Sequence, residues 1–333
     1  MAGVRFGPDR ALNARTLAVL PVLLAVNGVA LVAVGAVLGA TVVSLLAAVS
    51  DELAGWLLGL TLEFLPGGAG LSLWVLVGVA WGVGLIWAER RGSRRRLLKR
   101  LDVVEASPEV YPELYGIVQR LCAMADIEQP TIMVARYDRP NAFLIGRSLC
   151  VTEELPRRLT SAELEAVIAH ELGHVRHRDG ALMEWALSSG VLVFVIITKL
   201  RDLTRQQAKG TWLWLVFAAV FGWVYLVNRV LVSMLSRTRE LAADRSAAAL
   251  TARPSALASA LVKLDEKAAQ IPATDLRKVG AYSALMCVGL PGGDSVVARL
   301  VRTHPTLRCR LDRLAALSDG LAGPDGPGPR RQR

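Results

Sequence analysis

The feature that most constrains the fold is a run without any charged residue, which extends from Thr16 to Ser50. A helix in a soluble protein needs one hydrated face, and a run of this length leaves no such face. About 20 apolar residues in a helix cross the roughly 30 Å hydrocarbon layer of a bilayer. The run therefore predicts a membrane-spanning helix over residues 16–40.

A second apolar segment, residues 71–88, also predicts a membrane helix, and it leads directly into a basic cluster. The cluster comprises Arg90, Arg91, Arg94, Arg95, Arg96, Lys99 and Arg100. Arg5, Arg10 and Arg15 precede the first apolar run. Positive charge gathers on the cytoplasmic side of membrane proteins, so both basic groups are expected there. Residues 1–100 are thus predicted to form an N-terminal membrane anchor of two helices with a basic juxtamembrane segment.

The net charge of +10 also raises the possibility of nucleic-acid binding. The charge, however, is concentrated beside a membrane segment, where basic clusters typically contact anionic lipid. We therefore expect the lipid bilayer as a partner and no nucleic acid. The chain has four cysteines, which form no CxxC pair and have no zinc-finger spacing to the histidines, so we expect reduced thiols.

Residues 101–315 are predicted to form an α-rich domain with a small β-sheet. Apolar residues at helical spacing predict a helix over Glu109–Ala125. Three short runs predict strands, and a Gly146-Arg147 turn is expected to join the last two as a hairpin. These strands are Thr131–Ala135, Ala142–Ile145 and Ser148–Thr152. The Gly-Pro-rich residues 316–333 are predicted to be a disordered tail.

Two further hydrophobic segments interrupt this domain, at about residues 182–198 and 211–235, and both are predicted to be membrane helices. The loop between them is basic, and two full crossings would place it outside, against the positive-inside rule. The sequence leaves open whether these helices span the bilayer or pack against the domain. Residues 236–270 are predicted to be helical and outside the membrane.

The main chemical signal lies in a helix that begins with Thr160-Ser161-Ala162-Glu163, a capping box. This helix contains His170-Glu171-Leu172-Gly173-His174. Two histidines four residues apart project from one helix face, so both can bind a single Zn²⁺, with Glu171 as general base. A chance pentapeptide would leave an ordinary histidine pair. The chain has only four histidines, and the presence of two in this motif favours the metal.

A catalytic zinc site needs a third protein ligand. His177 is poorly placed, because a helix would turn it away from a metal shared with His170. Glu240 and Asp244 are four residues apart and therefore share one helix face. Glu240 is the candidate third ligand, and Asp244 is the candidate acceptor for the ring N–H of a ligating histidine. The alternative is that Glu240 and Asp244 are ordinary solvent-exposed acids near arginines on a helix.

Four motifs follow one another along the chain. They are Pro140-Asn141-Ala142-Phe143, the run from Glu163 to His174, Arg239-Glu240-Leu241-Ala242-Ala243-Asp244 and Thr303-His304-Pro305-Thr306-Leu307-Arg308. Together they resemble the M48 peptidases, and the HtpX-type membrane proteases more than the CAAX-type processing proteases. The resemblance implies a mostly α membrane protein with a zincin-like domain. It also implies Zn²⁺ bound by His170, His174 and Glu240, with Glu171 as base and Asp244 behind a ligand.

Two further roles come partly from this resemblance. Asn141, Ala142 and Phe143 would lie on an edge strand beside the zinc and bind a peptide substrate through backbone hydrogen bonds. The alternative is a simple strand start. His304 would donate a hydrogen bond to the oxyanion of the tetrahedral intermediate. The alternative for His304 is a capping or surface histidine.

Two residues carry weaker expectations. Arg308 would contact the substrate or pair with an acid near the site, and Asp179 would orient the end of the motif helix. The chain also departs from the family at one point, because Leu241 stands where an aromatic residue is common. This difference concerns packing near Glu240 rather than its role as a ligand.

The expected function is an integral membrane zinc endopeptidase of the bacterial inner or plasma membrane. It would span the membrane several times and cleave membrane or misfolded proteins from the cytoplasmic side, in protein quality control. Polypeptides, chiefly membrane proteins, are the expected substrates, and the oligomeric state does not follow from the sequence. One alternative is a non-catalytic zinc-binding membrane scaffold or regulator, which would not need Glu171. Another is a CAAX-type processing protease, which would need a prenylated partner.

Overall fold

The computed structural model describes residues 101–177 apart from Asp138, residues 211–269 and 300–321, and isolated residues between 14 and 99. Contacts divide the chain into two compact units. Unit 1 consists of Met1–Thr16, Arg94–Met183 and Ser233–Arg333, and unit 2 consists of Leu17–Ser93 and Glu184–Val232. The motif helix, Glu240, Asp244 and the segment around His304 all belong to unit 1.

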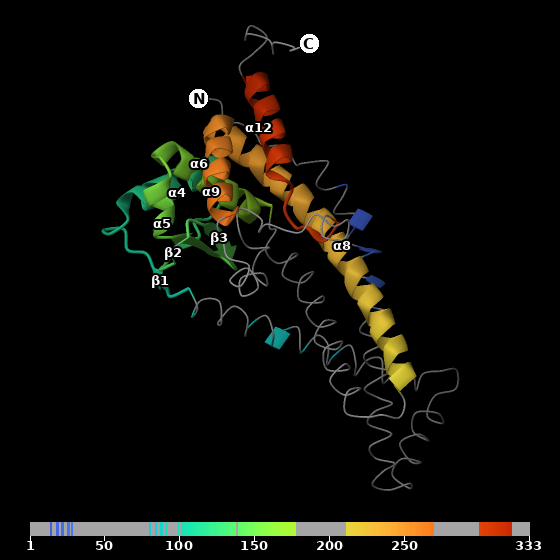
Figure 1. Cartoon of the computed structure of the whole chain (residues 1–333). Coiled ribbons are helices and arrows are strands. Elements are labelled where there is room, and N and C mark those ends of the chain that lie inside the picture. Colours follow the sequence, from blue (N-terminus) through green and yellow to red (C-terminus); the bar gives the residue numbers. More distant parts are fainter. Residues whose placement is uncertain are drawn as a thin grey trace, which may run out of the picture. The chain divides into compact units, whose positions relative to one another are not determined.

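Unit 1 contains a four-stranded mixed sheet with the strand order β1-β2-β4-β3 (Figure 1). Its strands are β1 (Val103–Glu105), β2 (Thr131–Ala135), β3 (Ala142–Ile145) and β4 (Ser148–Thr152). The strand β4 pairs in parallel with β2 and antiparallel with β3, while β1 pairs antiparallel with β2. Strand β3 therefore forms one edge of the sheet.

The three predicted strands are confirmed with the predicted bounds, and the short strand β1 was not predicted. The hairpin between β3 and β4 turns at Gly146, whose φ of 63° is readily adopted only without a side chain. The predicted helix at Glu109–Ala125 begins three residues later, as α4 (Pro112–Ala125). Its proline lies in the first turn, where the missing N–H has no helical partner to lose.

The other described helices are α5 (Glu154–Arg158), α6 (Ser161–Arg176), α8 (Thr211–Thr251), α9 (Pro254–Ala269) and α12 (Leu307–Leu321). The central helix of unit 1 is α6, which contacts α4, α5, α9 and β3. The main core is formed by apolar side chains from these helices and from the inner sheet face. Its fully buried members include Leu121, Ile132, Leu149, Ile168, Leu172, Leu261 and Leu314. The chain thus forms a helix-rich domain with a small mixed sheet.

The predicted capping box is confirmed at the start of α6. The Thr160 backbone N–H donates to Glu163 Oε2 at 2.8 Å, and the Thr160 hydroxyl accepts from the Glu163 backbone N–H. The same carboxylate also accepts from Ser259 at 2.6 Å and from Lys263 at 2.7 Å, both on α9. Burial raises the pKa of Glu163, but these donors outweigh burial and lower it to about 2. The motif helix is therefore fixed to α9 at its first turn.

Helix α8 corrects the expected helix boundaries. Residues 211–235 and 236–251 form one continuous helix, and the predicted helix over 236–270 is broken at Ala252, whose φ is 53°. Pro254 then starts α9 (Figure 1), because proline cannot continue α8 but fits the first turn of a new helix. At the C-terminus α12 runs to Leu321, so the predicted tail boundary at residue 316 falls inside a helix.

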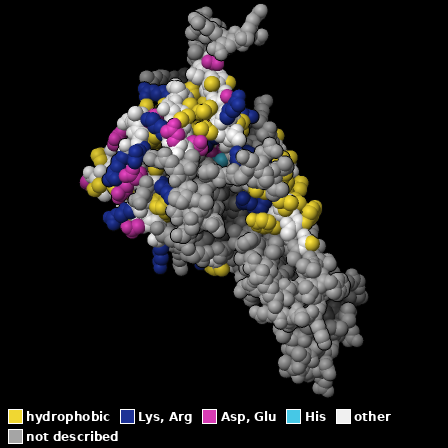
Figure 2. Space-filling model, in the orientation of Figure 1, with side chains coloured by type: hydrophobic (Ala, Val, Ile, Leu, Met, Phe, Trp, Pro, Cys, Tyr) yellow, Lys and Arg dark blue, Asp and Glu magenta, His cyan; other side chains and the backbone are white. Residues whose placement is uncertain are grey.

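Apolar side chains are exposed along α8. Trp223, Leu226 and Met234 are all exposed, and their spacing places them on one helix face. Figure 2 shows hydrophobic side chains gathered along this helix, whereas acidic and basic side chains are interspersed over the region of α4, α5 and α6. Within the described residues, no helix is long and apolar enough to cross a membrane. The predicted membrane helices at 16–40, 71–88 and 182–198 lie almost entirely outside those residues.

Candidate metal centre

The two motif histidines lie one turn apart on the same side of α6. The centroids of the His170 and His174 rings are 5.0 Å apart, and the ring planes are nearly perpendicular, at 88°. His170 is completely buried, whereas the His174 side chain keeps 17% of its surface exposed. One imidazole therefore lies deep in the domain, and the other lies toward its surface.

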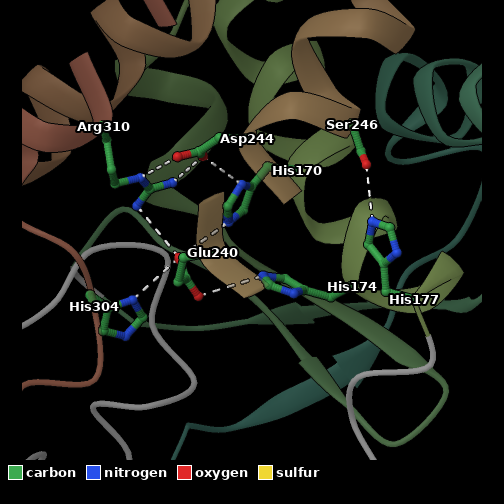
Figure 3. Close-up of polar contacts among 8 residues, drawn as sticks. All are labelled: His170, His174, His177, Glu240, Asp244, Ser246, His304 and Arg310. Carbon is green, nitrogen blue, oxygen red and sulfur yellow. Dashed lines mark hydrogen bonds and ion pairs between the residues drawn. The ribbon is translucent and has the colours of Figure 1, made fainter. Parts of the chain in front are cut away.

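Helix α8 places Glu240 opposite both rings (Figure 3). Glu240 Oε2 is 3.6 Å from His170 Nε2, and Glu240 Oε1 is 3.6 Å from His174 Nε2. One possible ligand atom from each of the three side chains lies within 4.8 Å of the other two. Among the residues that the structure describes, this is the one group of three such side chains that could hold a metal ion.

The distances in this group fit a metal better than a hydrogen-bond network. Two ligands at 2.0–2.1 Å from a tetrahedral zinc lie about 3.4 Å apart. The observed 3.6 Å separations are close to that value and are long for hydrogen bonds. His170 Nε2 and Glu240 Oε2 are buried and have no hydrogen-bond partner. Such orphaned polar atoms are costly unless a further group satisfies them, and a metal ion would do so.

The electrostatics of the group favour metal-binding protonation states for two of its members. Burial raises the pKa of Glu240, but the surrounding histidines, His304 first, outweigh burial and lower it well below its usual range. Burial lowers the pKa of His174 to about 4. Glu240 is therefore ionised and His174 is neutral at neutral pH, as metal ligands must be.

His170 behaves differently. Burial lowers its pKa, but Asp244 and Glu240 outweigh burial and raise it to about 9. A metal at Nε2 therefore competes with a proton for this ring.

Glu171, the predicted general base, is buried, and it lies between His170 and His174 in the sequence. Burial raises its pKa above the usual range, and the neighbouring histidines oppose this shift. A carboxyl group with a raised pKa exchanges protons near neutral pH more readily than a solvated one. This environment suits the predicted role of general base.

The structure brings Asp244 behind His170, on the side away from Glu240. Asp244 Oδ1 lies 3.0 Å from His170 Nδ1. Asp244 is in turn held by Arg310 of α12, which donates from Nε to Oδ2 at 2.8 Å and from Nη2 to Oδ1 at 2.6 Å. All three side chains are buried, and Figure 3 shows Asp244 between Arg310 and His170.

The sequence motif predicts a role for Arg308, whereas the structure places Arg310 against Asp244. Arg308 is exposed, two positions earlier on the same helix. A signal for Arg310 was available, because it shares a helix face with Leu307 and Leu314. An arginine on an apolar helix face needs a buried acidic partner, and Glu240 and Asp244 on α8 are the candidates.

His304 is buried, and its Nδ1 lies 3.3 Å from Glu240 Oε2. One ring nitrogen of His304 therefore faces the candidate ligand. The predicted hydrogen bond to an oxyanion would have to come from the other nitrogen, Nε2. Asp179, predicted to orient the end of α6, lies outside the described residues. The end of α6 instead carries His177, whose Nε2 is 3.1 Å from Ser246 Oγ on α8.

The predicted peptide-binding residues lie at the start of the edge strand β3, which contacts α6. The Asn141 backbone N–H donates to Thr152 Oγ1 at 2.8 Å, and Asn141 O accepts from the Thr152 N–H at 3.0 Å. The backbone of Asn141 therefore faces β4. Backbone groups alternate in direction along a strand, so those of Ala142 and Leu144 face the open edge. Phe143 itself is buried against Ile145 and Cys150.

Two histidines one turn apart on a helix, with a carboxylate from a second helix opposite them, form the ligand set of a His-Glu-x-x-His metallopeptidase. The sequence comparisons agree with this class. The sequence model of Peptidase family M48 matches residues 108–318, and the chain belongs to that family. The predicted family is thereby confirmed.

The chain is similar to proteins that carry the name Protease HtpX homolog. The chain is 42% identical over 274 residues to "Protease HtpX homolog 1" of Streptomyces coelicolor, covering 78% of this chain and 88% of that protein. It is 37% identical over 240 residues to "Protease HtpX homolog" of Moorella thermoacetica, covering 69% and 80%. Among solved structures it is similar to S. mikatae Ste24p, with a TM-score of 0.46 and 18% identity. That match covers 81% of this chain and 63% of the other.

Proposed function

We propose that this chain is an integral membrane, zinc-dependent endopeptidase that cleaves membrane or misfolded proteins on the cytoplasmic side. The observation that carries the proposal is the group formed by the buried His170 and Glu240 and the partly exposed His174, in a chain of family M48. Two imidazoles and one carboxylate are a common ligand set of catalytic zinc, which keeps a further position open.

In this proposal His170, His174 and Glu240 hold Zn²⁺. Zinc bound there would polarise the peptide carbonyl and lower the pKa of a water molecule. Glu171 accepts a proton from the attacking water and then donates it to the leaving amine nitrogen. Asp244 Oδ1, which lies 3.0 Å from His170 Nδ1, would accept the proton on Nδ1, so that Nε2 is the ring nitrogen that binds the metal. His304 donates from Nε2 to the oxyanion.

The substrate would bind as an extra strand along β3. The outward backbone groups of Ala142 and Leu144 offer one donor and one acceptor each to an extended peptide. Because such pairing uses backbone atoms, it tolerates many sequences. This tolerance suits a protease that removes misfolded proteins rather than one that processes a single site.

Location at a membrane is supported by the sequence and by α8. The charge-free run from Thr16 to Ser50 is long enough to cross a bilayer. The exposed apolar face of α8, with Trp223, Leu226 and Met234, is of the kind that mixes with lipid rather than with water. In this proposal residues 1–100 form the anchor and residues 101–315 the protease domain, with the arginine clusters in the cytoplasm.

The test compares the wild type with Glu171→Gln, as full chains in detergent. Zinc content and cleavage of an unfolded, membrane-anchored reporter are both measured. We expect about one zinc per chain in each protein, and a loss of cleavage of about 10²-fold or more in the variant, because the general base is missing. Glu165→Gln on the same helix is the matched control, since Glu165 pairs with Arg120 at 2.9 Å and belongs to none of the proposed roles.

The other outcomes identify the alternatives. Zinc in both proteins without cleavage by either would favour a non-catalytic zinc scaffold. Cleavage of only a prenylated CAAX peptide would favour a processing protease. If the wild type holds no zinc, the ligand assignment is wrong.

A further inference from the structure

We propose that Arg310 is a positioning residue of the metal centre, which fixes Asp244 and thereby the orientation and proton of His170. The C-terminal helix α12 would then be part of the metal site, although it supplies no ligand. This inference rests on the proposed zinc function of His170, His174 and Glu240.

The contact between Arg310 and Asp244 is bidentate. Arg310 Nε donates to Oδ2 at 2.8 Å, and Arg310 Nη2 donates to Oδ1 at 2.6 Å. A planar guanidinium that binds both carboxylate oxygens fixes the plane of the carboxylate as well as its position. Both side chains are 3% exposed, so water does not replace the contact.

The fixed carboxylate then acts on His170. Asp244 Oδ1 receives the 2.6 Å hydrogen bond from Arg310 and also lies 3.0 Å from His170 Nδ1. An acceptor held at this point keeps the imidazole proton on Nδ1. The other nitrogen, Nε2, faces Glu240 Oε2 at 3.6 Å, which is the side on which a metal would bind (Figure 3).

The same guanidinium also faces the candidate ligand Glu240. Arg310 Nη1 is 3.6 Å from Glu240 Oε2, so the same guanidinium faces two buried carboxylates one turn apart on α8. Buried acids without a cation are strongly destabilising. Arg310 is carried by α12, which packs on α9, and α9 packs on the motif helix α6. Metal binding and docking of α12 are therefore expected to support each other.

The inference is tested with full-length protein in detergent, stripped of metal and titrated with Zn²⁺ against a chelator of known affinity. Arg310→Gln is expected to weaken zinc binding by about 10- to 100-fold, the usual effect of losing a partner behind a ligand. Arg310→Lys keeps the positive charge but cannot bind both carboxylate oxygens as a guanidinium does. Its zinc affinity is expected to lie between those of the wild type and Arg310→Gln. Arg313→Gln is the matched control, because Arg313 is exposed on the same helix.

A double variant shows whether Arg310 acts through Asp244. Asp244→Asn combined with Arg310→Gln removes both members of the buried ion pair, so Asp244 is not left as a carboxylate without its arginine. We expect its zinc affinity to lie within about twofold of that of Asp244→Asn alone, since both changes break one chain of contacts. With Co²⁺ in place of zinc, the visible spectrum of Arg310→Gln should differ from that of Arg313→Gln, because the His170 ligand is reoriented.

Three results would overturn the inference. One is zinc affinity in Arg310→Gln equal to that in Arg313→Gln. Another is a double variant whose loss is the product of the two single losses. The third is an Arg310→Gln variant that, without metal, unfolds at a lower temperature than the wild type but binds zinc with unchanged affinity. That result would make Arg310 a purely structural residue. Failure of the wild type to bind zinc would instead overturn the proposed function, and this inference with it.

Discussion

Gly173 on α6 and Ala243 on α8 approach so closely that a Cβ on Gly173 would lie 3.3 Å from the Cα of Ala243. Gly173 directly precedes His174, and Ala243 directly precedes Asp244. The same added Cβ would lie 3.4 Å from Cβ of Ser246, the partner of His177. This close approach of the two helices is thus beside the residues that would hold the metal.

Gly173→Ala is expected to disturb the metal centre. The new methyl group must push the α8 backbone by a few tenths of an ångström, and overpacking of this kind costs about 1–3 kcal/mol. The same shift moves Glu240 relative to the histidines, so zinc affinity should fall several-fold. Thermal unfolding and zinc titration are the measurements.

Gly116→Ala on α4 is the matched control for this substitution. A Cβ at Gly116 meets no atom within 4 Å, so alanine should stabilise the helix by about 0.5–1 kcal/mol. If Gly173→Ala behaves like Gly116→Ala in both measurements, the close helix contact does not set the ligand geometry.

Glu163→Gln is expected to remove a pH-dependent part of the stability. The pKa of Glu163 in the folded protein is lowered to about 2, so folding favours its ionised form. The sign follows from this shift: the stabilisation is fully present above the ordinary pKa of about 4.5 and is lost as the pH falls toward 2. At pH 7 the variant should be less stable by roughly 2 kcal/mol, because Lys263 and Ser259 lose the charged acceptor of their hydrogen bonds.

This difference is measured as the gap between the unfolding midpoints of wild type and variant at several pH values. The gap should be constant between pH 6 and 8 and should shrink below about pH 4.5. Lys263→Gln, which removes the cation from the same carboxylate, should show a gap of the same sign. A gap that grows as the pH falls would contradict the assignment.

The elements that were predicted well are those whose signals are local. The strands β3 and β4 could be predicted because they are short apolar runs on either side of Gly146, which can adopt the positive φ of the turn. The strand β2 could be predicted because it is a short apolar run of its own. The start of α6 could be predicted because both halves of its capping box lie within four residues. The histidine pair could be predicted because its geometry is set by the helix itself.

The features that were missed depend on contacts between distant segments. Strand β1 has only three residues, and it is a strand because Val104 pairs with Val134 of β2. Arg310 was missed because its partner lies 66 residues earlier, on α8. The break between α8 and α9 was an exception, since Pro254 was visible in the sequence and predicts a helix start.

His304→Ala is expected to lower kcat and to leave zinc binding nearly intact. Loss of one donor to an oxyanion typically lowers kcat by about 10²- to 10³-fold. Glu240 would still be flanked by His170, His174 and Arg310, so it should keep its place. Steady-state kinetics with a fluorescent peptide and zinc content by atomic spectroscopy are the measurements.

The opposite pattern would assign His304 another role. If the variant loses zinc but regains full kcat when zinc is added in excess, His304 serves to hold Glu240 through its Nδ1, which lies 3.3 Å away. His304→Gln helps to separate donation to the oxyanion from the contact with Glu240. Its side-chain amide can still donate a hydrogen bond, but it has no second ring nitrogen to contact Glu240.

Leu144→Pro is expected to raise KM while zinc content stays unchanged. The backbone N–H of Leu144 faces the open edge of the sheet, and proline would remove this donor without breaking a bond to β4. One lost hydrogen bond of about 1 kcal/mol corresponds to a five- to tenfold weaker substrate. Leu144→Val, which keeps the N–H and a similar apolar side chain, is the control. A rise in KM shared by both variants would mean that the side chain matters, and an unchanged KM in Leu144→Pro would show that the substrate does not pair with this edge.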